Sequence, residues 1–118
     1  MDAPPPSRHA HYYHDADLAR FGEVSRGAPA LAKKFFDWYN AVFAEGALTT
    51  REKSLIALAV AHAVQCPYCI DAYSKDALER GSNLDEMTEA VHVAAAIRGG
   101  ASLVHGVQML NRVDELGM

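Results

Sequence analysis

The run from Leu55 to Val64 constrains this chain more than any other, because nine of its ten residues are apolar and only His62 is polar. Thr49 and Glu52 precede it in the Thr-x-x-Glu spacing of a capping box, which predicts the start of a helix. A helix that is apolar all round must be enclosed on every side. The run is too short for a membrane span of ~20 residues, so it predicts the central helix of a globular protein.

Helical patterns cover most of the remaining chain, and no segment alternates like a β-strand over more than a few residues. Proline, glycine and capping residues mark the expected ends, with Gly99 and Gly100 read as the C-terminal cap of one helix. The expected helices cover about 17–26, 29–45, 49–65, 67–80, 84–98 and 101–116. The sequence therefore predicts an all-α fold of five to six helices.

The domain organisation expected for the 118 residues is a flexible arm over 1–14 and one helical domain over 15–118. The arm contains three prolines and three histidines, and it is either a solvated tail or a binder of metal or of a neighbouring subunit. Val91 to Ile97 is a second run that is apolar except for one histidine. One small domain can hardly enclose two such helices, so we expect subunits to cover the remainder in a homo-oligomer.

The charge balance argues against a nucleic-acid partner, because 15 acidic residues outnumber 11 basic ones and the net charge is -4. No secretory signal or membrane span is recognisable, so we expect a cytoplasmic protein with no membrane partner. In that compartment a pair of cysteines spaced C-x-x-C is typically redox-active or metal-binding.

The two cysteines, Cys66 and Cys69, flank Pro67 and Tyr68 in a spelling that glutaredoxins share. A helix rather than a strand precedes them, and no proline follows Pro67, so the thioredoxin fold is not expected. Pro67 suits the first turn of a helix, which places both sulfurs near the positive end of the helix dipole. We expect this to lower the thiol pKa from ~8.5 toward neutrality and to let the pair close a disulfide.

These features together resemble the alkylhydroperoxidase D-like, carboxymuconolactone decarboxylase superfamily over about Ala28 to Met109. The resemblance implies an all-helical fold, dimers, trimers or hexamers, and an antioxidant enzyme of the thiol peroxidase or disulfide oxidoreductase type. A peroxide or disulfide would be its substrate and a thiol its reductant. The stretch 90–100 is similar to a peroxidase-like subgroup associated with arsenosugar biosynthesis. The matching segments are 48–52, 66–69, 77–81 and 87–91.

The family's peroxidases imply that Cys69 attacks the peroxide and Cys66 resolves the product. Their proton relay is not matched. Tyr73 stands where they carry a histidine four residues after the second cysteine, and Tyr68 where some carry another. Ser54 stands where they carry a glutamate.

Replacements for this relay can be sought among polar residues near the motif. His62 lies four residues before Cys66, the spacing of one helical face, and could hold or remove a proton. Glu52 already serves the capping box and would need a fold-back of the chain or a neighbouring helix to reach the cysteines. Tyr73 could hydrogen-bond a thiolate. His92 and His105 could approach from later helices or be structural.

Three other functions stay open at this stage. His62, Cys66 and Cys69 could bind a metal, and the dithiol could bind trivalent arsenic, although zinc would lack a fourth ligand. The second alternative is a decarboxylase or ring-opening enzyme of the family. The third is a non-catalytic oligomeric scaffold. No cofactor is expected, since the chain has no glycine-rich phosphate loop or dinucleotide fingerprint. We expect the aromatic residues to pack in the core and at subunit contacts, and these residues are Tyr12, Tyr13, Phe21, Phe35, Phe36, Trp38, Tyr39 and Phe43.

Overall fold

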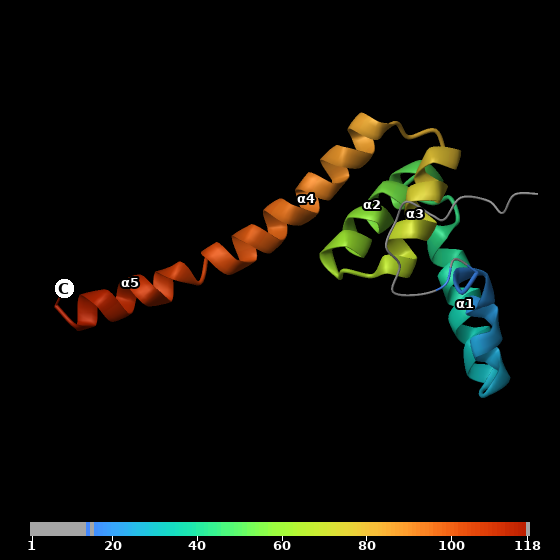
Figure 1. Cartoon of the computed structure of the whole chain (residues 1–118), viewed down its shortest axis with the longest axis horizontal. Coiled ribbons are helices and arrows are strands. Elements are labelled where there is room, and N and C mark those ends of the chain that lie inside the picture. The colour runs from blue at the N-terminus through green and yellow to red at the C-terminus, as the bar shows by residue number, and fades with distance from the viewer. Residues whose placement is uncertain (1–13, 15, 118) are drawn as a thin grey trace, which may run out of the picture. The chain divides into compact units, whose positions relative to one another are not determined.

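The computed structural model describes residues 14 and 16–117, and within them every regular element is a helix, as predicted. Most of the expected N-terminal arm, with Tyr12 and Tyr13, lies outside these residues. The chain divides between Ala44 and Glu45 into two compact units, which are described separately. The elements in order are η1 (Leu18–Arg26), α1 (Pro29–Phe43), α2 (Thr50–Ala63), α3 (Pro67–Glu79), α4 (Leu84–Leu103) and α5 (Gly106–Glu115) (Figure 1).

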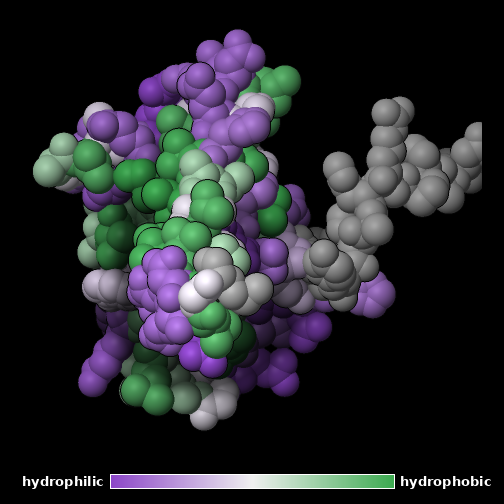
Figure 2. Space-filling model, turned by 90° about the vertical axis from the view of Figure 1, so that its left-hand side faces the viewer, coloured by the Kyte–Doolittle hydropathy of each residue, from purple (hydrophilic) through white to green (hydrophobic). Residues whose placement is uncertain are grey.

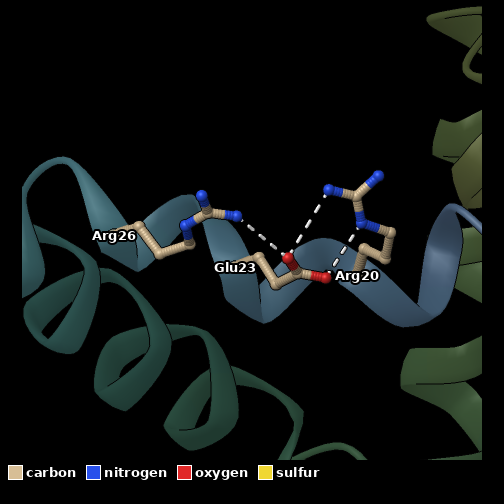
Figure 3. A network of polar contacts seen from close by, with 3 residues as sticks. All are labelled: Arg20, Glu23 and Arg26. Atoms are coloured by element: carbon tan, nitrogen blue, oxygen red, sulfur yellow. Dashed lines mark hydrogen bonds and ion pairs between the residues drawn. The ribbon is translucent and has the colours of Figure 1, made fainter.

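The N-terminal unit pairs η1, a 3₁₀ helix, with α1. The ring of Phe21 meets Phe36 edge-on at a centroid distance of 5.1 Å and Phe35 at 6.3 Å. On the exposed side of η1, Glu23 accepts hydrogen bonds from both Arg20 and Arg26 (Figure 3). Such exposed pairs contribute little stability, so the aromatic contacts are what hold these two helices together.

The C-terminal unit is built around α2, which packs against α3 and α4. The capping box predicted for its start is present: Thr49 Oγ1 accepts from Glu52 N–H at 3.0 Å, and Glu52 Oε1 accepts from Thr49 N–H at 2.9 Å. The buried face of α2 follows a helical spacing and carries mostly small side chains. Small residues let helix axes approach closely. The buried residues of the unit are Ser54, Leu58, Ala61, Ala77, Ser82 and Ala94.

Two polar contacts fix α4 beside α2. Arg51 in the first turn of α2 forms an ion pair with Glu86 in the first turn of α4. Twelve residues further along each helix, Arg98 donates a hydrogen bond to the carbonyl oxygen of Ala63 at 2.7 Å. Because both pairs keep the same spacing, α2 and α4 run in parallel over about 18 Å. The stretch of α4 after Arg98 continues beyond the end of α2 (Figure 1).

The expected helix end at Gly99 and Gly100 is wrong, because α4 continues through both to Leu103. A glycine C-cap requires a positive φ, and in the described part of the chain the only glycines with one are Gly81 and Gly117. Gly100 instead accepts an ordinary helical hydrogen bond from Val104 N–H at 2.9 Å. Helix α5 therefore begins at Gly106 instead of near residue 101.

Apolar side chains are left on the surface of α4 and α5. Ala94 is the one buried residue of α4, and α5 has none. Figure 2 shows hydrophobic residues at the surface beside hydrophilic ones, on the side where α5 lies in Figure 1. None of the described helices is long and apolar enough to cross a membrane. The exposed large apolar residues from Val93 onward are Val93, Ile97, Leu103, Val104, Val107, Met109, Leu110, Val113 and Leu116.

Candidate active site

The turn between α2 and α3 is a Schellman motif that leads directly into the cysteine pair. Gln65 N–H donates to the carbonyl oxygen of His62 at 3.2 Å, and Cys66 N–H donates to that of Ala61 at 3.1 Å. Gln65 holds the left-handed position of this motif with φ 56°, where glycine is the usual residue. The strain of a side chain there is about 1 kcal/mol, and it is held by the hydrogen bonds on either side.

Cys66 caps the N-terminus of α3, and Pro67 follows at the first helical position, as predicted. The sulfur of Cys66 accepts the backbone N–H of Cys69 at 3.3 Å. The carbonyl oxygen of Cys66 accepts the N–H of Ile70 at 2.9 Å. Together with the bond from its own N–H to Ala61, these contacts fix Cys66 through its amide, its carbonyl and its sulfur.

The two sulfurs are free thiols whose Sγ atoms lie 2.8 Å apart. A disulfide bond requires ~2.05 Å, so the pair could be joined by a movement of less than ~1 Å. Both cysteine side chains are half-buried. The geometry supplies a dithiol that can be oxidised without refolding.

The expectation of a lowered pKa is wrong for Cys69. Burial raises the pKa of the Cys69 thiol, and the hydrogen bond with Cys66 and the charge on Cys66 raise it further, to about 11. The helix dipole acts in the opposite sense but is outweighed. Since a neighbouring negative charge is one of the causes, the pair resists holding two thiolates at once.

The helical register that predicted a stacking of His62 on Cys66 ends before the cysteine, because α2 ends at Ala63 and the chain turns at Gln65. The Nδ1 atom of His62 lies 2.8 Å from the carbonyl oxygen of Leu58 and must carry a proton to donate to it. In the neutral ring Nε2 is therefore the unprotonated nitrogen. His62 is half-buried, and this nitrogen is the atom that could accept a proton.

Glu52 and Ser54 lie in the first turns of α2, away from the cysteines. The pKa of Glu52 is lowered because its carboxylate accepts hydrogen bonds from Thr49. About 16 Å of helix separates Glu52 from Ala63, so one chain does not bring it to the thiols. Ser54 is fully buried, and its hydroxyl donates to the carbonyl oxygen of Arg51 at 2.6 Å. The position of the family glutamate is therefore part of the core here.

The other candidates lie on three helices. Tyr73 is half-buried on α3, one turn after Cys69, whereas Tyr68 is 40% exposed. His92 on α4 and His105 before α5 are both exposed. Across residues 14 and 16–117, no three His, Cys, Asp or Glu side chains are grouped so that they could hold a metal ion. The metal alternative, with His62 as a third ligand, gains no support from this geometry.

Two residues near the site were not singled out from the sequence. Gln65 shapes the turn through its left-handed backbone, and Arg98 binds the last turn of α2. Glutamine gives no signal for a positive φ. The hint of a tight turn in the sequence is that Gln65 directly precedes Cys66 and Pro67, which begin a helix.

The fold and the site define an all-helical protein with adjacent thiols at the start of a helix. Residues 29–112 match the carboxymuconolactone decarboxylase family. The chain belongs to this family, which is part of the alkylhydroperoxidase D-like superfamily that the sequence resembles.

Curated relatives and solved structures agree with this assignment. An uncharacterized protein encoded in the cox locus of Paracoccus denitrificans is 42% identical over 83% of this chain and 88% of its own length. A protein from Methanobacterium thermoautotrophicum has 38% identity and a TM-score of 0.68 over 71% of this chain and 94% of its own. The apo form of a carboxymuconolactone decarboxylase family protein from Legionella pneumophila has 31% identity and a TM-score of 0.61, over 87% of this chain and 89% of its own.

Proposed function

We propose that the protein is a cysteine-dependent oxidoreductase of the alkylhydroperoxidase type that uses Cys66 and Cys69 as a redox pair. The supporting observation is the separation of 2.8 Å between two free, half-buried sulfurs at the start of α3. One thiolate attacks a peroxide, so that an S–O bond forms, the O–O bond breaks and an alcohol leaves. The second thiol attacks the resulting sulfenic acid, a disulfide forms and water leaves. A thiol reductant then returns both cysteines to the thiol form.

Proton transfer in this proposal depends on groups near the turn. His62 supports it best, because its bond to Leu58 leaves Nε2 as a proton acceptor in the neutral ring. Tyr73, one turn beyond Cys69, could donate a hydrogen bond to the leaving oxygen. Glu52 could take part only if a neighbouring subunit brought it near. Arsenosugar metabolism is the proposed setting, and the similarity of residues 90–100 to that subgroup is its sole support.

The test is stoichiometric oxidation of the reduced protein by hydrogen peroxide, followed by mass spectrometry. We expect the intact chain to lose two hydrogens as the disulfide forms, and peroxide to be consumed repeatedly once dithiothreitol is added. Cys66→Ser and Cys69→Ser should each stop this turnover, and Thr88→Ser, an exposed change on α4, is the matched control. A wild type that neither forms the disulfide nor consumes peroxide with any thiol donor overturns the proposal.

The same adjacent thiols support a second candidate function, the binding of a trivalent arsenical. Two sulfurs this close can replace two ligands of one arsenic atom. Phenylarsine oxide should then form a one-to-one adduct with the reduced wild type that both serine variants lack. An adduct that forms equally well with either single-cysteine variant contradicts this candidate.

We also propose that the protein is a homo-oligomer in which copies of the chain cover the apolar surface of α4 and α5. Leu103 is 81% exposed, Ile97 69% and Val104 64% in the single chain. Apolar residues clustered in this way mark interaction sites more often than free surface. We also propose that the protein is cytoplasmic, a location that does not change what is expected of this apolar surface.

A further inference from the structure

The carbonyl end of α2 is completed by a side chain from α4. The last four carbonyl oxygens of a helix have no partner within the helix, and in α2 all four accept hydrogen bonds. Three of the donors are backbone N–H groups of the turn that follows. These bonds run from Val64 to Val60, from Gln65 to His62 and from Cys66 to Ala61. The fourth donor is Arg98, which reaches the carbonyl oxygen of Ala63 at 2.7 Å from a position 35 residues further along the chain.

The position of Cys66 depends on the same helix end. Its N–H is held by the carbonyl of Ala61, two residues or ~3 Å of helical rise before the carbonyl that Arg98 binds. Its sulfur lies 2.8 Å from that of Cys69. Helix ends fray, and fraying of the last turn of α2 would release the N–H of Cys66 and let the two sulfurs separate. The bond from Arg98 opposes this fraying.

We propose that Arg98 is a positioning residue for the redox pair. By holding the end of α2 against α4, it keeps the sulfurs of Cys66 and Cys69 in contact and favours the disulfide over the dithiol. This inference rests on the proposed function, because it concerns how readily the two cysteines are oxidised together. Arg98 acts through the backbone of the turn, so its role is the same whichever thiol attacks first.

The effect of Arg98 on the disulfide is one of populations. The disulfide keeps the sulfurs together and so favours the ordered turn, whereas the dithiol samples both the ordered turn and frayed conformations in which the sulfurs are apart. The bond from Arg98 is made only in the ordered turn, so it raises the fraction of the dithiol that is ready to close. The gain in the equilibrium constant for disulfide formation is at most that of the hydrogen bond itself, roughly two- to tenfold.

The experiment equilibrates the folded protein at pH 7 with a buffer of reduced and oxidised glutathione and measures the disulfide fraction by mass spectrometry after an acid quench. In this exchange two protein S–H bonds and one glutathione S–S bond break. One protein S–S bond and two glutathione S–H bonds form, so two electrons pass from the protein to glutathione. The ratio of the two protein forms at a known glutathione ratio gives the equilibrium constant.

Two variants of Arg98 separate the hydrogen bond from the rest of the side chain. Arg98→Met removes the donor and keeps the apolar stem, so the equilibrium constant should fall at least about twofold and up to about tenfold below that of the wild type. Arg98→Lys keeps a charged donor and should recover part of this loss. Arg98 is exposed, so neither change creates a buried defect. Circular dichroism of both variants should reproduce the wild-type helix content.

Arg51→Met is the matched control. Arg51 joins the same two helices through its ion pair with Glu86, but it does so at the other end of their contact, about 18 Å from Arg98. This variant should lose some overall stability and leave the equilibrium constant for disulfide formation unchanged. As long as a variant stays folded at pH 7, a loss of overall stability alone does not alter that constant, whereas a change at the cysteine turn does.

Reciprocity supplies a second measurement that does not depend on glutathione. If Arg98 favours the disulfide, the disulfide strengthens the contribution of Arg98 to stability by the same factor. Arg98→Met should therefore cost more stability in the oxidised protein than in the reduced protein, and urea unfolding of the two forms measures the difference. Equal costs in the two forms would contradict the positioning role.

The outcomes distinguish the inference from the function on which it rests. An equilibrium constant that is the same in Arg98→Met as in the wild type, or that falls equally in Arg51→Met, overturns the positioning role and leaves the redox pair standing. A wild type that forms the disulfide with glutathione but consumes no peroxide overturns the peroxidase function, and the comparison of the variants still decides the role of Arg98. A wild type that forms no disulfide overturns both.

Discussion

The guanidinium Nη1 of Arg98 lies 2.7 Å from the carbonyl oxygen of Ala63, across the contact between α4 and α2. This carbonyl belongs to the last turn of α2, where a cation also opposes the negative end of the helix dipole. Three residues later the chain reaches Cys66. Arg98 therefore holds the end of the helix from which the cysteine turn begins.

Arg98→Met should lower the free energy of unfolding by about 1 kcal/mol, because a charged hydrogen bond between helices is lost while the apolar stem is kept. Urea unfolding at a fixed protein concentration measures this. Arg112→Met is the matched control, since Arg112 pairs with Glu115 on the surface of a single helix. It should cost less than about 0.5 kcal/mol. Equal losses in the two variants would contradict the role given to Arg98.

Substitutions to and from glycine test the two left-handed turns, at Gln65 after α2 and at Gly81 after α3, in opposite directions. Gln65 has φ 56° and Gly81 has φ 91°, and both follow a helix. Gln65→Gly should stabilise the protein by about 0.5–1 kcal/mol, because the strain of a side chain in the left-handed region is removed. Gly81→Ala should destabilise it by about 1 kcal/mol, since a Cβ there meets no atom within 4 Å and only backbone strain remains.

The two values come from the same urea titration. The direction of each change is the informative result, because a general effect of glycine on the unfolded chain would destabilise Gln65→Gly and stabilise Gly81→Ala. A loss of stability in Gln65→Gly would contradict the strain assigned to the cysteine turn.

Gly99→Ala tests the continuation of α4. A Cβ at Gly99 would have open space, and the backbone there is helical. Alanine should then raise the free energy of unfolding by up to about 1 kcal/mol, the usual difference between these residues inside a helix. If Gly99 were the end of the helix, as the sequence suggested, alanine would instead be destabilising. The sign of the change, measured by thermal or urea unfolding, distinguishes the two.

Local sequence signals predicted most of the helix boundaries. The capping box at Thr49 and the proline at position 67 depend on residues three apart or fewer, so the chain itself specifies them. The glycines at 99 and 100 misled the prediction because glycine tolerates both helix and cap. The hydrogen bonds of the following turn, such as that from Val104 N–H to the carbonyl oxygen of Gly100, continue the helix instead of ending it.

The site was less predictable than the fold. The proximity of Cys66 and Cys69 follows from their spacing at a helix start, and the structure has them in contact. The environment of Cys69 could not be derived in the same way, because its burial and the charge beside it depend on three-dimensional packing. His62 shows the same limit, since the turn at Gln65 ends the helical register that would have aligned it with Cys66.

Ionisation of the two thiols should occur in separate steps that absorbance near ~240 nm can follow, since thiolates absorb there. The late step should fall near pH 11, the raised pKa of Cys69. Cys66→Ser removes two of its three causes, the hydrogen bond with Cys66 and the charge on Cys66. The pKa of Cys69 should then fall toward its ordinary value. A late step that is unchanged in this variant would show that burial alone sets it.

The same shift predicts an alkaline loss of stability. The folded protein prefers the protonated form of Cys69, so this contribution is complete below the ordinary thiol pKa of 9.0 and is lost as the pH rises through about 11. Urea unfolding between pH 8 and pH 11 should show a smaller alkaline decline in Cys69→Ser than in the wild type, with Thr88→Ser as the control.

The proposed oligomer predicts that a charge on the apolar surface of α4 and α5 separates the subunits without unfolding them. Sedimentation equilibrium of the wild type should give a multiple of the 12.8 kDa chain mass. Leu103 is 81% exposed in the single chain, so Leu103→Glu costs little there, but it removes about 1.5–3 kcal/mol for each leucine buried between copies. The dissociation constant should therefore rise at least about tenfold. Gln108→Glu, an exposed polar position on α5, adds the same charge and should leave the mass unchanged. A wild type that sediments at the mass of one chain contradicts the proposal.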